Sequence, residues 1–178
     1  MNIRHPTADE LTVIQDIEVA SGRQFGDIGL QMIADDPPPA VATLAGYRDA
    51  GRAWVATDDH DRPVAFLIAD LVDGDAHIAQ VSVHPGHARR GIGAALIEHL
   101  ATWARERGLP ALTLTTYTGV PWNGPYYARL GFHPVPDADL PPGLRAIRDE
   151  EIGRGLDRWP RTAMRRELYA PGEDPSGV

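Results

Sequence analysis

The chain contains neither cysteine nor lysine among its 178 residues. The absence of cysteine excludes disulfides, thiolate nucleophiles and cysteine-ligated metals. The absence of lysine excludes Schiff-base chemistry and a phosphate loop of the Walker type, which requires a lysine. These two absences remove several enzyme classes before any motif is considered.

A surplus of positive charge and a long apolar run are also missing. The formal net charge of −8 argues against a nucleic-acid partner, which a protein contacts through a basic face. No apolar stretch has the length of a membrane span, and the N-terminal residues lack the apolar segment of a signal peptide. The histidines, including His84, His87, His99 and His133, show no metal-ligand spacing. We therefore expect a cytoplasmic protein with no nucleic-acid, membrane or metal partner.

Hydrophobic periodicity predicts a mixed α/β fold in a single domain over residues 1–170, with a disordered tail over residues 171–178. Three strands joined by tight polar turns predict an antiparallel meander. The strand after the long central helix is expected to run parallel to the strand before it. The expected strands are 2–4, 53–57, 63–71, 77–83, 111–117, 132–135 and 162–168, and the expected helices start at 8, 40, 90, 125 and 144. Helices on both faces would cover this mainly antiparallel sheet.

Local signals also predict how some segments begin and end. Thr7 and Glu10 have the spacing of a capping box at the first helix. Asn123 is expected to cap the short helix over 125–130. Residues 21–39, which include an Asp-Asp-Pro-Pro-Pro run, are expected to be irregular.

The stretch with the most chemical information is Val81–Leu96, VSVHPGHARRGIGAAL. A β-branched strand stops at a proline, and two arginines and Gly-Ile-Gly then lead into an amphipathic helix. Unpaired amides and the dipole at such a helix start favour an anion, and glycines let the main chain approach it closely. The stretch therefore predicts a pyrophosphate-binding site.

Two other phosphate motifs fail here on their side chains. A Walker loop needs the lysine that the chain lacks. A dinucleotide fingerprint, Gly-x-Gly-x-x-Gly, needs a third glycine where Leu96 stands. It also needs an acidic residue at the end of the next strand, where the chain has Leu112, Thr113 and Leu114.

A second informative stretch is Pro121–Phe132, PWNGPYYARLGF. Its helix carries paired tyrosines and ends in Leu-Gly-Phe. Tyr126 and Phe132 are expected in the core, whereas Tyr127 is expected to point toward whatever binds beside the helix.

Together these two stretches resemble the GNAT superfamily of N-acyltransferases. The family pattern is Gln/Arg-x-x-Gly-x-Gly/Ala after the fourth strand and a Tyr-x-x-Leu-Gly-Phe helix after the fifth. Residues 88–94, ARRGIGA, and residues 127–132, YARLGF, match it here, with Ala88 where the family has Gln or Arg. The order of elements agrees from residue 1 to about residue 168.

The resemblance implies a three-layer α/β/α fold whose six- to seven-stranded sheet is splayed between strands four and five. It also implies acetyl-CoA as co-substrate, with pantetheine bonded to the backbone of Val81 and Val83. The pyrophosphate would be held by Arg89, Arg90, Gly91, Ile92, Gly93 and Ala94. Asn123 is a further expected CoA contact, with a helix cap as the alternative, since the common family spacing to the tyrosine places Val120 at that position.

The chemistry that the resemblance implies is direct acyl transfer to an amine. A strand amide near Val81 would polarise the thioester carbonyl, and Tyr127 would protonate the leaving thiolate. Relatives often place a glutamate on the fourth or fifth strand as base, but His77, Ala79 and Thr115 stand at the matching positions. His77 or a water chain is the candidate base, with a structural histidine as the alternative.

The resulting expectation is an N-acetyltransferase that acts on a small-molecule amine or a peptide N-terminus. Two alternatives stay open: a catalytically weak acyl-CoA-binding regulatory module, and a protein N-terminal acetyltransferase. The acceptor pocket is expected to be lined by residues 25–32, the loop after Tyr117, Trp122 and residues 136–160. A homodimer through the final strands is also an open alternative.

Overall fold

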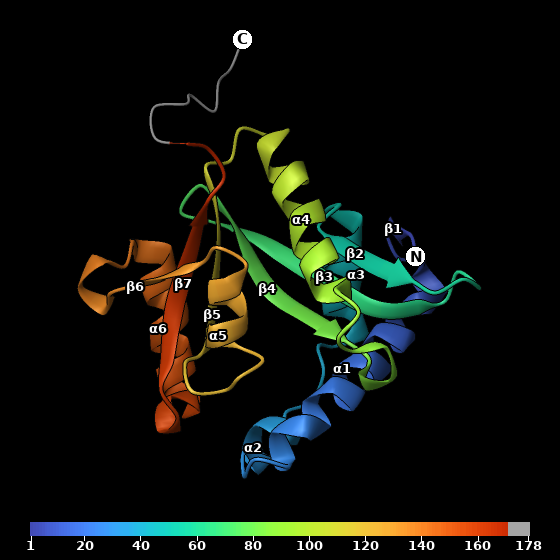
Figure 1. Cartoon of the computed structure of the whole chain (residues 1–178), viewed down its shortest axis with the longest axis horizontal. Coiled ribbons are helices and arrows are strands. Elements are labelled where there is room, and N and C mark those ends of the chain that lie inside the picture. The colour runs from blue at the N-terminus through green and yellow to red at the C-terminus, as the bar shows by residue number, and fades with distance from the viewer. Residues whose placement is uncertain (171–178) are drawn as a thin grey trace. The chain divides into compact units, whose positions relative to one another are not determined.

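The computed structural model describes residues 1–170, and the expected tail over 171–178 lies outside the described residues (Figure 1). Seven strands form one mixed sheet in the order β1-β2-β3-β4-β5-β7-β6. The pair β4–β5 is parallel, and the pairs β1–β2, β2–β3, β5–β7 and β6–β7 are antiparallel. The strands are β1 (Ile3–Arg4), β2 (Ala53–Thr57), β3 (Pro63–Val72), β4 (Asp75–Val83), β5 (Ala111–Tyr117), β6 (His133–Val135) and β7 (Arg161–Glu167). The mixed, mainly antiparallel sheet predicted from the sequence is confirmed.

The helices agree with the predicted ones except near residues 21–39. They are α1 (Leu11–Gly26), α2 (Gln31–Ala34), α3 (Val41–Asp49), α4 (Ile92–Arg105), α5 (Gly124–Arg129) and α6 (Pro142–Gly153). Four short 3-10 turns are η1 (Ala8–Glu10), η2 (Pro85–His87), η3 (Asp137–Asp139) and η4 (Leu156–Arg158). Within residues 1–170, no helix is long and apolar enough to cross a membrane.

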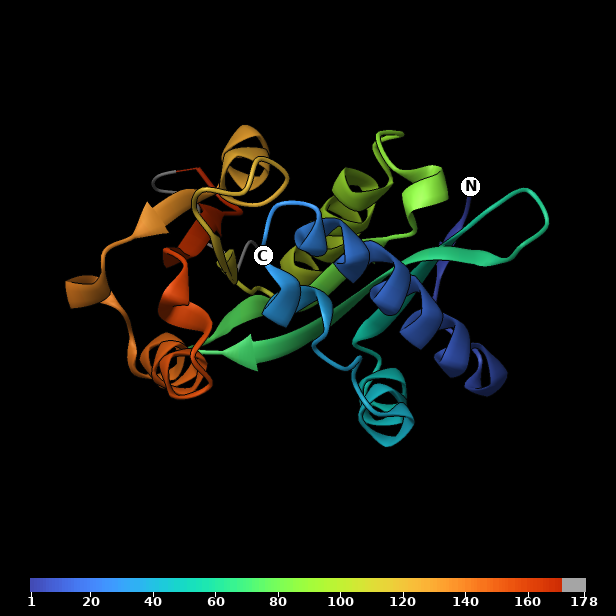
Figure 2. The same ribbon diagram turned by 90° about the horizontal axis from the view of Figure 1, so that it is seen from below.

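The expectation of an irregular segment over 21–39 is wrong. Helix α1 continues to Gly26, and α2 follows it and lies against it in both views (Figures 1 and 2). The two glycines of α1 face α2: a Cβ on Gly26 would lie 3.0 Å from the Gln31 Oε1 atom, and one on Gly22 would lie 3.8 Å from the Ala34 carbonyl oxygen. Close packing of α2 thus offsets the low helix propensity of these glycines.

Residue contacts divide the chain into two units, which we describe separately. The first unit consists of Met1–Ala69 and Ala79–His99, and the second of Asp70–Ile78 with the residues from Leu100 onward. Strands β3 and β4 and helix α4 contribute residues to both units. The expectation of a single domain over 1–170 stays a prediction.

In the first unit, α1 and α3 pack apolar side chains on strands β2 and β3. Leu11, Ile14 and Ile17 follow the three- and four-residue spacing of one helix face, as expected for an amphipathic helix. Full burial of one such side chain contributes about 1.5–3 kcal/mol. The buried cluster comprises Leu11, Ile14, Ile17, Leu44, Ala53, Val55, Phe66 and Ile68.

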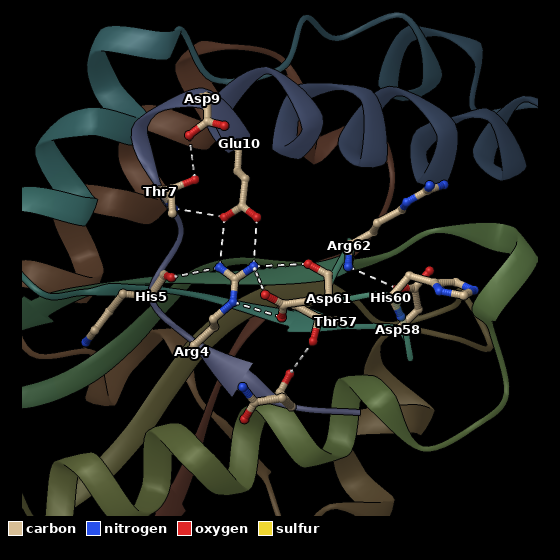
Figure 3. Close-up of polar contacts among 11 residues, drawn as sticks. Arg4, His5, Thr7, Asp9, Glu10, Thr57, Asp58, His60, Asp61 and Arg62 are labelled. Atoms are coloured by element: carbon tan, nitrogen blue, oxygen red, sulfur yellow. Dashed lines mark hydrogen bonds and ion pairs between the residues drawn. The ribbon is translucent and has the colours of Figure 1, made fainter.

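A polar network fixes the N-terminal end of the first unit (Figure 3). The Arg4 guanidinium donates to both oxygens of Glu10, at 2.9 and 2.8 Å, and to the carboxylate of Asp61. The Thr7 backbone N–H donates to Glu10 Oε2 at 2.9 Å, as in the predicted capping box. Hydrogen bonds from Arg4 hold the pKa of the Glu10 carboxyl at about 2. The network joins β1, the start of the first helix and the β2–β3 turn.

In the second unit, a carboxylate from the β3–β4 turn caps helix α6. The Asp73 oxygens accept from the N–H groups of Gly143 and Leu144, at 2.8 and 2.9 Å. A Cβ on Gly143 would lie 2.7 Å from Val72 Cγ1, so only glycine fits here. This cap joins residues 70 positions apart and has no signal in the local sequence.

Candidate active site

The predicted pyrophosphate site is a turn of unusual backbone conformation followed by the start of α4. Arg89 has φ +61° and Gly91 has φ +74°. A left-handed conformation costs a residue with a side chain roughly 1–2 kcal/mol, so Arg89 is held there by its surroundings. The Arg89 and Arg90 side chains are exposed.

The amides at the start of α4 are arranged for an anion. The helix begins at Ile92, and its first internal bond runs from the Ala95 N–H to the Gly91 carbonyl at 2.9 Å. The N–H groups of Ile92, Gly93 and Ala94 therefore come before the first internal donor of the helix. Such amides, with the positive end of the helix dipole, form a site suited to phosphate.

The backbone groups of β4, the strand before this turn, point alternately to the two edges of the strand. The His84 N–H donates to the Val64 carbonyl on β3 at 2.8 Å. Because successive backbone groups of a strand point to opposite edges, those of Ser82 also point to β3. The N–H and C=O groups of Val81 and Val83 then point away from β3. An extended ligand such as pantetheine could bond to them there.

A carboxylate from α1 that the sequence analysis did not select lies against the same strand. Gln80 Nε2 and Ser82 Oγ both donate to the carboxylate of Glu18, the latter at 2.5 Å. Since both side chains reach one carboxylate, they share one face of β4, which supports the regular two-residue alternation there. Burial raises the pKa of Glu18 above its ordinary value, against the opposing effect of these two hydrogen bonds.

In the second unit, Tyr127 lies on α5 close to two other aromatic rings. Its ring centroid is 5.3 Å from that of Tyr126 and 5.8 Å from that of Phe132. Phe132 is buried, as predicted, whereas Tyr126 is only partly buried. Burial raises the pKa of Tyr127 above that of a free phenol, so the hydroxyl is protonated at neutral pH and available as a proton donor.

The expected capping role of Asn123 is wrong. Its side chain makes no cap hydrogen bond to α5, and only its backbone carbonyl accepts, from the Tyr127 N–H at 2.9 Å. The Asn123 Nδ2 atom is buried without a hydrogen-bond partner among the described residues. A buried amide donor of this kind is costly unless a ligand satisfies it. Its predicted contact with CoA stays a prediction.

His77 lies on β4 at the parallel pairing with β5, opposite Thr113. It is 4% exposed, and its Nδ1 atom is 3.0 Å from Thr113 Oγ1. Burial lowers the pKa of His77, although nearby carboxylates oppose this effect. The imidazole is therefore neutral at neutral pH, and the Thr113 hydroxyl orients it.

A second carboxylate missed by the sequence analysis lies beside β5. The Thr115 hydroxyl donates to Glu151 of α6. Arg148 Nη1 donates to Glu151 at 2.5 Å, and Arg161 Nη2 donates to it at 2.9 Å. Burial acts to raise the pKa of Glu151, but the hydrogen bonds and charges of its partners outweigh it and hold that pKa below the ordinary value. The Arg148–Glu151 spacing of three residues on α6 was the only signal for this network in the sequence.

The structure thus gathers the predicted residues in two sets. The first unit carries Val81, Val83 and the predicted pyrophosphate site from Arg89 to Ala94, and the second carries His77, Asn123 and Tyr127. Among residues 1–170, no group of three or more histidine, aspartate or glutamate side chains is placed to hold a metal ion.

Comparison with known proteins shows the family to which the chain belongs. A family model described as "Acetyltransferase (GNAT) family" matches residues 23–132, which is more than half of the chain. The chain belongs to the GNAT acetyltransferase family.

One curated protein and two solved structures are similar to the chain. The chain is 34% identical over 73 residues to [Ribosomal protein bS18]-alanine N-acetyltransferase of Salmonella typhimurium, covering 41% of this chain and 49% of that protein. The chain spans about half the length of the curated relatives it matches. A GNAT acetyltransferase from Staphylococcus aureus superposes with a TM-score of 0.72 at 16% identity, over 94% of this chain and 99% of that one. A PaiA N-acetyltransferase from Thermoplasma acidophilum, solved in complex with coenzyme A, superposes with a TM-score of 0.70 at 12% identity, over 93% of this chain and 98% of that one.

Proposed function

We propose that this protein transfers the acetyl group of acetyl-CoA to a primary amine by direct attack of the amine on the thioester. The observation that carries the proposal is the continuous path from β4 to α4. Backbone groups of Val81 and Val83 directed away from β3 lead into helix-start amides suited to a pyrophosphate.

In this proposal the cofactor is held mainly by backbone. The N–H and C=O groups of Val81 and Val83 bond the pantetheine, and a strand amide near Val81 polarises the thioester carbonyl. Asn123 contributes its buried amide to the CoA arm. The pyrophosphate is bound by the turn and helix start formed by Arg89, Arg90, Gly91, Ile92, Gly93 and Ala94.

The chemical step needs a neutral amine and a protonated leaving group. The amine nitrogen attacks the carbonyl carbon, the C–S bond breaks, and Tyr127 gives its proton to the CoA thiolate. His77 or a water chain is the candidate proton acceptor from the sequence, with a structural histidine as the alternative. The low exposure and lowered pKa of His77 support a neutral imidazole, as a base requires.

The acceptor is a primary amine, either a peptide N-terminus or a small molecule. The Salmonella relative is named for the alanine of a ribosomal protein, which supports a peptide N-terminus as one class. Small amines form the other class. A panel of alanine-initiated peptides, amino acids, polyamines and aminoglycosides covers both.

The direct test measures acetyl-CoA binding by calorimetry and free-thiol release with each amine of the panel. Binding together with amine-dependent thiol release supports the proposal. Binding without thiol release for any amine would indicate an acyl-CoA-binding regulatory module, and absence of binding would contradict both.

The role of Tyr127 is tested by Tyr127→Phe. Removing the proton donor should lower kcat about 100-fold or more, with little change in CoA affinity, since general acid catalysis contributes roughly that much. Tyr126→Phe, which removes a hydroxyl from the adjacent residue, is the matched control and should retain turnover. Unchanged turnover in Tyr127→Phe would remove Tyr127 from the acid role.

A further inference from the structure

Glu18 is a half-buried carboxylate whose hydrogen-bond donors are neutral. Gln80 and Ser82, which donate to its two oxygens, carry no charge to balance it. The negative charge of Asp36 also raises the Glu18 pKa. An anion in this setting has unused lone pairs and gains from a cation or a proton.

The position of Glu18 ties it to the strand proposed to hold the cofactor. Gln80 and Ser82 alternate along β4 with Val81 and Val83, whose backbone groups the proposed function assigns to pantetheine. The two hydrogen bonds thus fix the carboxylate to the four-residue stretch that would hold the thioester end of acetyl-CoA.

Glu18 also shares a helix face with the segment where the acceptor is expected. Residues at spacings of four, seven and eight lie on one face of an α-helix, so Glu18 aligns with Gly22, Phe25 and Gly26. Phe25 begins the segment over 25–32 that the sequence analysis assigned to the acceptor pocket.

We propose that Glu18 binds the ammonium group of the acceptor and accepts its proton before the attack on acetyl-CoA. This assignment rests on the proposed function and identifies its acceptor as a cationic primary amine. The ammonium N–H bond breaks and the proton passes to the Glu18 carboxylate. The neutral amine then forms the C–N bond as the C–S bond breaks, and Glu18 later releases its proton to water.

The test compares Glu18→Gln with wild type, using acetyl-CoA and the most active amine of the panel. Loss of the base should lower kcat/KM for the amine about 100-fold near pH 6.5, with the KM for acetyl-CoA unchanged. The deficit in kcat/KM should shrink about tenfold for each pH unit by which the pH rises toward the pKa of the amine, because the free amine then forms without a base. Asp16→Asn, the same charge change at an exposed position of α1, should behave as wild type.

A second variant keeps the carboxylate and changes only its environment. Ser82→Ala removes a hydrogen bond that lowers the Glu18 pKa, so the acidic limb of the pH–rate profile should move to higher pH. A merely structural role for Glu18 predicts no such shift. His77→Ala should leave the limb in place, which separates the two candidate bases.

The outcomes separate the two levels of the proposal. Wild-type transfer with identical pH profiles in wild type, Glu18→Gln and Ser82→Ala overturns the role of Glu18 and leaves acetyl transfer standing. If Glu18→Gln does not fold, an unshifted limb in Ser82→Ala overturns that role by itself. Wild-type protein that neither binds acetyl-CoA nor releases thiol overturns the proposed function, and the role of Glu18 with it.

Discussion

Glu18 in the first unit and Glu151 in the second are both withdrawn from water, but they differ in their donors. Neutral Gln80 and Ser82 contact Glu18, whereas two arginines, Arg148 and Arg161, contact Glu151. The pKa of the first is raised by burial, and the pKa of the second is held low despite burial. Burial alone therefore does not decide the chemistry of a carboxylate. The neutral donors of Glu18 do not offset the effect of burial, which suits the proposed proton acceptor, whereas the arginines of Glu151 keep it an anion at neutral pH.

The largest expected effect comes from removing the paired anion. Glu151→Ala leaves the guanidinium groups of Arg148 and Arg161 buried without this carboxylate. Breaking such a pair should cost roughly 3–5 kcal/mol of unfolding free energy. Urea denaturation of the variant and the wild type measures this loss. Glu18→Ala, which leaves only neutral donors, should cost clearly less. Equal losses of unfolding free energy in the two variants would show that the charge of the donors does not set this cost.

A third way to satisfy a carboxylate is by backbone amides, as Asp73 does at the start of α6. Asp73→Gly removes the cap while suiting the positive φ of 53° at this position. It should lower the unfolding free energy by about 1 kcal/mol, the usual worth of a helix cap, in the same urea assay. Asp73→Asn, which suits the same positive φ and keeps a side-chain oxygen that accepts from an amide N–H, is the matched control and should lose less. A loss no larger than in the control would contradict the capping role.

A carboxylate paired with arginine near the surface should matter less than Glu151. In Glu10→Gln, only the partly exposed pairing with Arg4 is weakened, so a loss of up to about 1 kcal/mol is expected. Because the folded pKa of Glu10 is about 2, its contribution is present above pH ~4.3 and is lost as the pH falls toward 2. Thermal unfolding between pH 2 and 5 measures this window. Equal melting temperatures for variant and wild type across it would show that the pairing does not stabilise the fold.

The smallest expected effect is the direction in which the melting temperatures of Glu18→Gln and Glu151→Gln change with pH relative to wild type. The lowered pKa of Glu151 gives stability that is lost as the pH falls through that folded value. The raised pKa of Glu18 means that the folded state binds more protons, so its contribution weakens as the pH rises from the unfolded pKa to the folded one. As the pH rises toward about 4.3, the unfolded pKa of a glutamate, Glu151→Gln should lose melting temperature relative to wild type. As the pH rises further above about 4.3, Glu18→Gln should gain melting temperature relative to wild type. Shifts of the same sign would refute the contrast.

Features that depend on neighbouring residues were predicted correctly. Strand periodicity predicted the mixed sheet, and the glycines before α4 predicted a turn at a helix start. Both rest on local rules, namely the two-residue alternation of strands and the freedom of Gly91 at positive φ. The placement of acetyl-CoA on these residues stays a prediction.

Features that depend on distant partners were missed. The extension of α1 to Gly26 depends on α2 packing over two glycines, which local propensity opposes. Asn123 has the residue type of a helix cap, yet its backbone at φ −118° and ψ −109° is accompanied by no cap hydrogen bond. In both cases the surrounding structure overrode a local preference.

The sequence by itself determined the class of fold and predicted a site for phosphate, because helix starts, strands and turns follow from residues close in the chain. Only the tertiary structure decided the state of the acidic residues. Glu18 meets donors more than 60 positions away, and Asp73 reaches amides 70 positions away. A pKa depends on burial and on the charge of neighbours in space, and neither can be read from positions along the chain.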